Sequence, residues 1–176
     1  MVQGTETKLF KQYSQEEGYQ DNGGISMKPT ELQIGDYVFI KSLLGGYHTI
    51  PIRIAAVHQK KVGYHNRIDR LSWVRHGMLA PIQLTKEILE LNNFQVSSED
   101  ERIYERHLAN GIVVCVCVEA PHFISINYEV ETPDGKDGDN ISAFTKVDGG
   151  EIYFHDLQNH LRHSGLDVLA DELKVE

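Results

Sequence analysis

The feature that most restricts the fold of this sequence is a series of five short strand-like segments between residues 31 and 84. They are rich in β-branched and aromatic residues, turn residues separate them, and no helical period lies between them. Strands packed this closely along the chain predict a small SH3-like β-barrel over residues 27–84. The segments are "ELQIGDYVFIK" (31–41), "IPIRIAAVHQ" (50–59), "KKVGYH" (60–65), "LSWVRHG" (71–77) and "MLAPIQL" (78–84).

The second half of the sequence begins with a helix and continues with strands. "LTKEILELNNF" (84–94) predicts a helix with Thr85 as N-cap, ended by Asn92 and Asn93 because Asn tolerates the left-handed cap conformation. The turn-rich "TPDGKDGDN" (132–140) is expected to be a loop or hairpin tip between strands. The strand-like segments are "FQVSS" (94–98), "RIYERHLA" (102–109), "GIVVCVCVEA" (111–120), "HFISINYEVE" (122–131), "ISAFTKV" (141–147) and "EIYF" (151–154).

Two helices are expected near the C-terminal end. The first runs from about His155 to Ser164 and stops at Gly165; the second, "DVLADELK" (167–174), is short and has Asp167 as its cap. The whole sequence therefore predicts an α+β fold: a small SH3-like β-barrel followed by a helix, an antiparallel sheet and a C-terminal helix. The expected organisation is a polar, poorly ordered N-terminal extension (1–26), the small β-barrel (27–84) and an α+β unit (85–176).

Charge is distributed unevenly along the chain, which has a net charge of −9. Residues 28–84 contain eight Lys/Arg against three Asp/Glu, whereas residues 85–176 contain seven against nineteen. A basic first half joined to an acidic second half permits head-to-tail self-association through opposite faces, and the acidic half limits nonspecific binding to polyanions.

Two features of the composition favour a cytoplasmic protein without a membrane partner. The longest apolar run (111–120) is far shorter than the roughly 20 residues that span a bilayer, and the N-terminus lacks the apolar core of a secretory signal. Cys115 and Cys117 lie two positions apart in a β-branched run, so a strand would point both to one face. We expect them to be reduced, buried, small hydrophobic residues.

A basic stretch with interleaved aromatic residues, "KKVGYHNRIDRLSWVRH" (60–76), is the candidate nucleic-acid-binding segment. Cationic side chains neutralise phosphates, and aromatic faces stack on bases. In the alternative interpretation Trp73 and Val74 fill the barrel, and the charges are solvated or pair with the acidic half. The candidate residues are Lys60, Lys61, Tyr64, Arg67, Arg70, Trp73 and Arg75.

The helix predicted at 155–164 places three potential metal ligands on one face. Asp156 and His160 are four positions apart, and His163 follows three positions later, so the three could hold a metal in a small metal-dependent enzyme. The alternative is an exposed face whose charges follow the helix dipole. The sequence contains no zinc-protease spacing, phosphate-binding loop or nucleophile motif. It therefore favours a non-catalytic protein with no cofactor and no metal site.

Three short blocks give the sequence a family resemblance. They are "MKPTELQIGDYVFIK" (27–41), "PIQLTKEILELNNF" (81–94) and "HDLQNHLRHSG" (155–165). In this order they resemble a large group of short uncharacterised proteins from Bacteroides-type gut bacteria and their phages and mobile elements. The resemblance implies a small β-barrel followed by an α+β unit, and it carries no assigned activity. Residues 1–26 lie upstream of the usual start of those proteins, so Met27 is an expected alternative initiation site.

The expected function is that of a phage- or mobile-element-type binding or adaptor module whose partner is another protein. His155 and Gln158, which match the helix pattern of the resembling proteins, are the candidate partner-binding residues. The first alternative is a nucleic-acid-associated accessory protein that uses residues 60–76, and the second is the metal-dependent enzyme.

Overall fold

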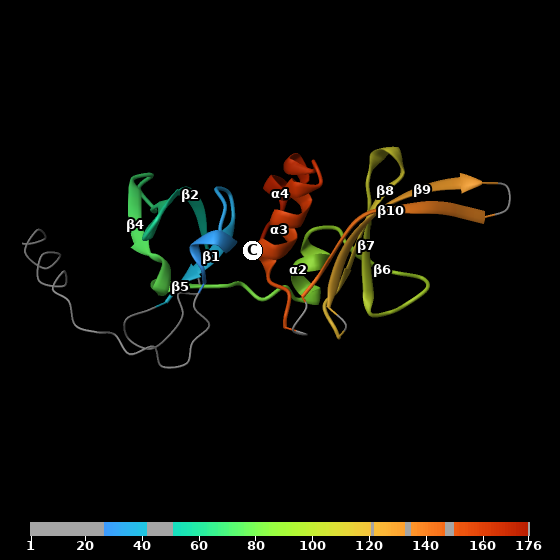
Figure 1. Cartoon of the computed structure of the whole chain (residues 1–176), viewed down its shortest axis with the longest axis horizontal. Helices are drawn as coiled ribbons and strands as arrows, with labels where there is room; N and C mark the ends of the chain where they lie inside the picture. The colour runs from blue at the N-terminus through green and yellow to red at the C-terminus, as the bar shows by residue number, and fades with distance from the viewer. Residues whose placement is uncertain (1–26, 42–50, 121, 133–134, 147–149, 176) are drawn as a thin grey trace, which may run out of the picture.

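The computed structural model describes residues 27–41, 51–120, 122–132, 135–146 and 150–175. The expected N-terminal extension (1–26) lies outside these residues. The predicted α+β class is confirmed: the chain forms two antiparallel five-stranded sheets and a small number of helices (Figure 1). Among the described residues, no helix is long and apolar enough to cross a membrane.

Sheet one contains the segments expected to form the barrel, in the order β4-β3-β2-β1-β5. Its strands are β1 (Tyr37–Ile40), β2 (Ile52–His58), β3 (Lys61–His65), β4 (Leu71–Arg75) and β5 (Leu79–Ala80). The 3-10 turn η2 (His76–Met78) joins β4 to β5. Within the described part of the chain, the pairing does not close on itself, so a closed SH3-like barrel stays a prediction.

Sheet two has the order β10-β9-β8-β7-β6. Its strands are β6 (Gln95–Val96), β7 (Ile103–His107), β8 (Ile112–Cys117), β9 (Phe123–Thr132) and β10 (Gly135–Thr145). The segment 132–140 is expected from the sequence to be a loop or hairpin tip between strands. The hairpin is confirmed, because β9 and β10 pair antiparallel, but the nine-residue loop is wrong, because Gly135 of β10 already pairs with Thr132 of β9. Backbone pairing along this long hairpin, with one register shift between Asn140 and Ser142, outweighs the turn preference of the Gly and Asp residues in the segment.

In the described ranges, three α-helices accompany the sheets: α2 (Lys86–Leu91), α3 (Phe154–His163) and α4 (Asp167–Glu172). Two further 3-10 turns are η1 (Pro29–Glu31) and η3 (Ala109–Gly111). The predicted N-cap of α2 is confirmed, since Thr85 Oγ1 accepts the backbone N–H of Ile88 at 3.4 Å. Asn93, which follows the C-cap residue Asn92, has the left-handed φ of 61° that its residue type tolerates.

Two details of the predicted C-terminal region are wrong. The segment 151–154 forms no named strand: Tyr153 makes only an isolated bridge to Gln83, and Phe154 already begins α3. The N-cap of α4 is Leu166, and Asp167 is the first helical residue. An acidic residue in the first turn still favours the positive end of the helix dipole.

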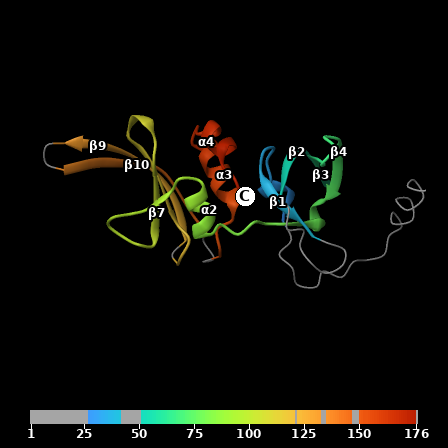
Figure 2. The same cartoon turned by 180° about the vertical axis from the view of Figure 1, so that it is seen from behind.

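Helix α3 lies between the two sheets and joins them (Figures 1 and 2). Its face toward sheet two carries Leu157 and Leu161, which are fully buried in the larger apolar core. Phe154 belongs to the same core, and its ring meets Tyr37 of β1 edge to face, with ring centroids 6.1 Å apart. Sheet one also has a smaller core of its own, centred on Val38, which is completely buried. The contact between the sheets therefore runs through α3.

Candidate ligand-binding surface

The register between β3 and β4 gives the basic stretch two different faces. Lys61, Gly63 and His65 pair with Arg75, Trp73 and Leu71, so these six residues share one face. We call this set the outer hairpin face. The alternate positions Val62 and Val74 face the smaller core of sheet one, and Tyr64 lies on that side as well.

Trp73 is the central feature of the outer hairpin face. Its side chain remains 44% exposed although the residue lies within a strand. It stands opposite Gly63, where an added Cβ would lie 3.4 Å from the Trp73 ring and 3.0 Å from Leu71. Lys61 Nζ lies 4.7 Å from the indole centroid, within cation–π range. The alternative in which Trp73 fills the barrel is therefore wrong.

The other cations of the stretch surround this face at both ends of the hairpin. Lys60 lies in the turn before β3, while Arg67 and Arg70 lie in the turn between β3 and β4. That turn is built around Asn66, whose Oδ1 accepts the backbone N–H groups of Ile68 and Arg70 at 3.1 and 3.0 Å. All three cationic side chains are exposed.

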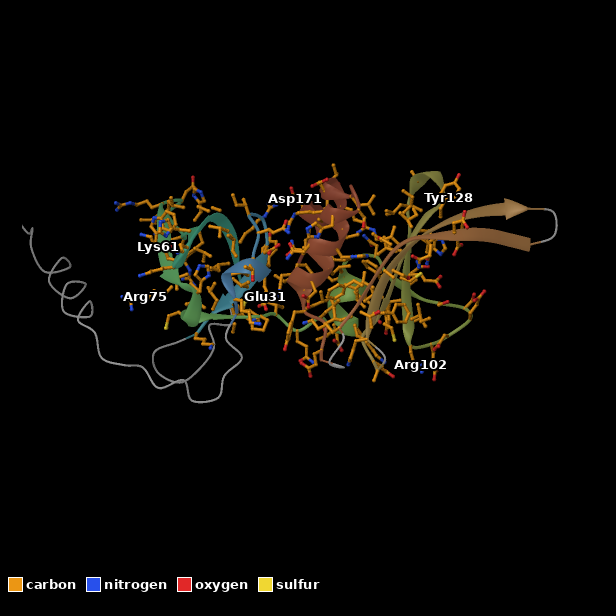
Figure 3. The ribbon with its side chains drawn as sticks, viewed as in Figure 1. Glu31, Lys61, Arg75, Arg102, Tyr128 and Asp171 are labelled. Atoms are coloured by element: carbon orange, nitrogen blue, oxygen red, sulfur yellow. The ribbon has the colours of Figure 1, made fainter. Side chains whose placement is uncertain are left out.

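The cations of the hairpin are not neutralised within the described part of the chain. None of Lys60, Lys61, Arg67, Arg70 and Arg75 forms an ion pair with a described residue; the nearby Asp69 instead lies 3.0 Å from His65. Figure 3 shows Lys61 and Arg75 at the end of the molecule formed by sheet one, remote from sheet two. The alternative in which these charges pair with the acidic half finds no support among the described residues.

Gln158, predicted to contact a partner, lies fully buried at the junction of α3 and sheet one. Its Oε1 accepts the backbone N–H of Tyr37 at 3.0 Å, and its Nε2 donates to the carbonyls of Gly35 and Ala170, both at 3.2 Å. One side-chain amide thus joins β1, the turn before it and α4. A partner contact through Gln158 stays a prediction, and the contacts observed are within the chain.

His155, the other candidate contact residue, is also buried at this junction. Its ring stacks on Tyr153 with centroids 5.8 Å apart, and its Nδ1 has no hydrogen-bond partner among the described residues. Burial lowers the pKa of the His155 imidazole below its ordinary value, although the nearby Asp156 and Asp36 carboxylates oppose the shift. Burial therefore favours the neutral form of the His155 imidazole.

The three potential metal ligands of α3 have separate contacts. The Asp156 carboxylate accepts the backbone N–H of Tyr153 at 2.8 Å and pairs with Lys146 Nζ at 2.8 Å. His160 Nε2 lies 3.2 Å from Ser142 Oγ, and His163 is exposed. No group of three potential metal ligands occurs in the ranges that the structure describes. Asp156 acts as a helix cap in this arrangement.

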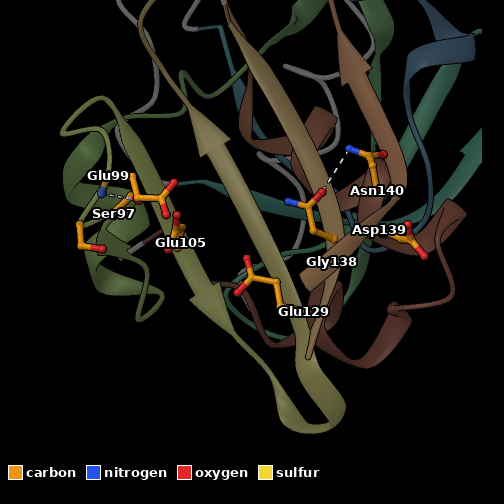
Figure 4. Close-up of a pocket in the computed structure, with 9 residues that line it drawn as sticks. Ser97, Glu99, Glu105, Glu129, Gly138, Asp139 and Asn140 are labelled. Carbon is orange, nitrogen blue, oxygen red and sulfur yellow. Dashed lines mark hydrogen bonds between the residues drawn. The ribbon is translucent and has the colours of Figure 1, made fainter. Parts of the chain in front are cut away.

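A groove of about 380 Å³ on sheet two was not anticipated from the sequence (Figure 4). Carboxylates from Glu99, Glu105, Glu129 and Asp139 line it, and Asn140 donates a hydrogen bond to Asn127 Oδ1 at 3.1 Å. A loop over residues 132–140 would not place Asp139 beside β9, whereas in the structure Asp139 pairs with Tyr128 of that strand. Four carboxylates in one groove make this end of the molecule unfavourable for an anion. Comparison with protein families, with curated proteins and with solved structures finds no match to this chain.

Proposed function

We propose that this protein is a non-catalytic binding module that recognises an anionic macromolecule through its outer hairpin face. The observation that carries the proposal is the exposed indole of Trp73, which stands among five cations that have no ion-pair partner in the described residues. Exposed aromatic and cationic side chains that gather on one face are typical of recognition surfaces.

Segregation of charge makes such binding possible in an acidic protein. A net charge of −9 opposes approach to any polyanion, yet the hairpin between Lys60 and Arg75 carries five Lys/Arg and one Asp. Because exposed charges are screened beyond about 8 Å at physiological salt, the local charge decides the contact. The carboxylate-lined groove on sheet two repels an anionic ligand. This repulsion would orient the protein so that sheet one faces the ligand.

We further propose that sheet one is a small SH3-like barrel and that the protein works in the cytoplasm. The strand order β4-β3-β2-β1-β5 and the position of η2 between β4 and β5 support the first proposal. The free thiols of Cys115 and Cys117, both buried in β8, support a reducing compartment.

An acidic segment of another protein is a second candidate ligand, in keeping with an adaptor role. Exposed apolar side chains favour it, since Ile68 is 71% exposed in the β3–β4 turn and Leu71 is 47% exposed on the outer hairpin face. Apolar side chains of this kind pack against a protein partner but gain little from phosphate.

Retention on immobilised heparin, a polyanion without bases, tests the proposed function. We expect the wild-type protein to be retained at low salt despite its net negative charge, and the K61Q/R75Q variant to elute earlier. The matched control is K28Q/K174Q, which removes the same charge from two exposed positions outside the hairpin. Equal retention of the two double variants, or no retention of the wild type, would refute the outer hairpin face as an anion-binding surface.

A further inference from the structure

We infer that the anionic ligand is a single-stranded nucleic acid, one of whose unpaired bases stacks on Trp73. This inference rests on the proposed function, because it assigns a ligand class to the same surface. It adds a requirement for bases to the requirement for negative charge. The phosphates on either side of the stacked base would contact the cations at the two ends of the hairpin.

The environment of Trp73 suits a stacking platform. Gly63 leaves room for the indole on the sheet, since a Cβ there would come within 3.4 Å of the ring. Leu71 borders the same space, and its side chain remains half exposed. Because the indole is already held against the strand, less side-chain entropy is lost when a base binds to it. Stacking of one base on an aromatic side chain is worth about 1–3 kcal/mol.

Lys61 has a specific place in this arrangement. In the free protein its ammonium group lies 4.7 Å from the indole centroid and makes a cation–π contact with the ring. Its flexible four-carbon stem allows the ammonium to move to a phosphate when a base takes the ring. Arg75 stands directly opposite Lys61 across the strand pair and supplies a second phosphate contact beside the platform.

The cations are spaced to follow a short strand. Lys60 lies beyond one end of β3, and Arg67 and Arg70 lie beyond the other end. A strand of the length of β3 spans about 16 Å, at roughly 3.3 Å per residue. That distance accommodates a site of about four nucleotides, the lower end of the range for small single-strand-binding folds.

The same surface favours unpaired over paired bases. A duplex presents base edges in its grooves and keeps the base faces stacked inside, so the exposed face of an indole gains little from it. An unpaired base can stack on the indole without first being unstacked from a duplex. An acidic peptide would satisfy the cations but would leave the aromatic platform with a non-specific apolar contact. The platform is the observation that favours nucleic acid over the protein ligand.

Tryptophan fluorescence of the full chain tests this inference directly, because Trp73 is its only tryptophan. The probes are a dT12 oligonucleotide, the same length of abasic oligonucleotide, and a 12-base-pair duplex. We expect dT12 to quench the fluorescence and to bind at least tenfold more tightly than the abasic strand at equal salt. The variants W73F and W73L lack the only tryptophan, so their affinities are measured by the fluorescence anisotropy of end-labelled dT12. We expect W73F to retain most of the affinity and W73L to lose about tenfold, because leucine keeps the apolar contact without an aromatic face.

The outcomes separate this inference from the proposed function. Equal binding of dT12 and the abasic strand, or equal affinity of W73F and W73L, would overturn base stacking while leaving polyanion binding intact. Preference for the duplex would also overturn it. If the protein is retained on heparin but binds no oligonucleotide, the ligand of the outer hairpin face would instead be an acidic segment of another protein. Loss of both heparin and oligonucleotide binding would reject the proposed function itself.

Salt dependence gives an independent measure of the phosphate contacts. The logarithm of the binding constant for a single strand changes with the logarithm of salt concentration by about −0.7 per neutralised phosphate. Removing Lys61 and Arg75 in K61Q/R75Q should therefore make the slope shallower by about 1.4. An unchanged slope in that variant would show that the phosphates bind elsewhere.

Discussion

Arg162 of α3 holds Asp36, the residue immediately before β1, through a 2.6 Å contact between Nη1 and Oδ1. The Asp36 side chain is completely buried, and Arg162 is nearly so. Asp171 of α4 extends the contact, lying 3.2 Å from Arg162 and 2.9 Å from Arg53 of β2. The two halves of the chain are therefore joined by a charged network as well as by the apolar contact of Tyr37 with Phe154.

The first prediction concerns this network. R162M should lower the free energy of unfolding by about 3–5 kcal/mol, because it leaves the Asp36 carboxylate buried without its cation. The double variant D36L/R162M, which removes both charges, should recover much of that loss. Urea unfolding followed by circular dichroism measures both. The control is D171N, whose carboxylate is half exposed and which should cost less than about 1 kcal/mol. Equal losses in R162M and D171N would contradict the prediction.

The second prediction concerns the pH dependence of stability. Burial lowers the pKa of His155 in the folded protein, so the unfolded chain takes up the proton first as pH falls. The free energy of unfolding should therefore decrease as pH drops below about 6.5, by up to about 1.4 kcal/mol per pH unit. Burial also lowers the pKa of His160, which contributes in the same direction.

H155F isolates the contribution of His155. Phenylalanine keeps an aromatic ring against Tyr153 and cannot titrate. Unfolding of H155F between pH 7 and 5 should show a shallower decrease in stability than the wild type, while H58Q, at an exposed position of β2 away from α3, should follow the wild-type curve. Parallel curves for wild type and H155F would assign the acid sensitivity to other groups.

A third prediction concerns Gly63, which pairs with Trp73 across β3 and β4. In G63A the new Cβ would lie 3.0 Å from Leu71 Cδ1 and 3.2 Å from Ala56 Cβ, so neighbouring side chains must move. The free energy of unfolding should change by less than about 1 kcal/mol, because loss of backbone freedom in the unfolded chain offsets the crowding. The emission of Trp73 should shift to longer wavelength as the ring moves outward, and binding of dT12 should weaken. Unchanged emission would show that Gly63 does not seat the indole.

The fourth prediction compares two glycines with left-handed backbone. Gly111 has φ of 74° and Gly165 has φ of 76°, so alanine at either costs about 1–2 kcal/mol of stability. At Gly111 the added Cβ would also overlap the backbone carbonyl of Glu129, whereas at Gly165 nothing lies within 4 Å. Thermal unfolding should therefore show a larger loss for G111A than for G165A. Equal losses would mean that the β9 backbone adjusts freely.

Local patterns predicted the elements of the fold well where neighbouring residues determine them. The five strand segments of sheet one and the Thr85 cap depend on residue types within a few positions, and the structure contains them. For the segment 132–140 the hairpin was predicted correctly, but the length of its loop was not. Its Gly and Asp residues favour a turn, whereas pairing with β9 over many positions extends the strand to Gly135.

The candidate site was predictable in part. The sequence identified the cations and Trp73, and period-two alternation separates Trp73 from Val62 and Val74. It could not decide which face the core would cover, since that depends on packing beyond the hairpin. The role of Gln158 was inaccessible for a related reason: its hydrogen-bond partner Tyr37 lies 121 positions away in the sequence. Contacts of this separation leave no local signal.

The central place of α3 also has a consequence for the order in which the protein matures. Translation produces both sheets before it produces α3 and α4, the helices that lie between them (Figure 1). Until then Tyr37 of β1 has no Phe154 to meet, and the core face of sheet two lacks Leu157 and Leu161. A nascent chain thus exposes apolar surface on sheet one while all of sheet two is synthesised, and on sheet two from its completion until α3 follows, so chaperones can bind the chain in that interval.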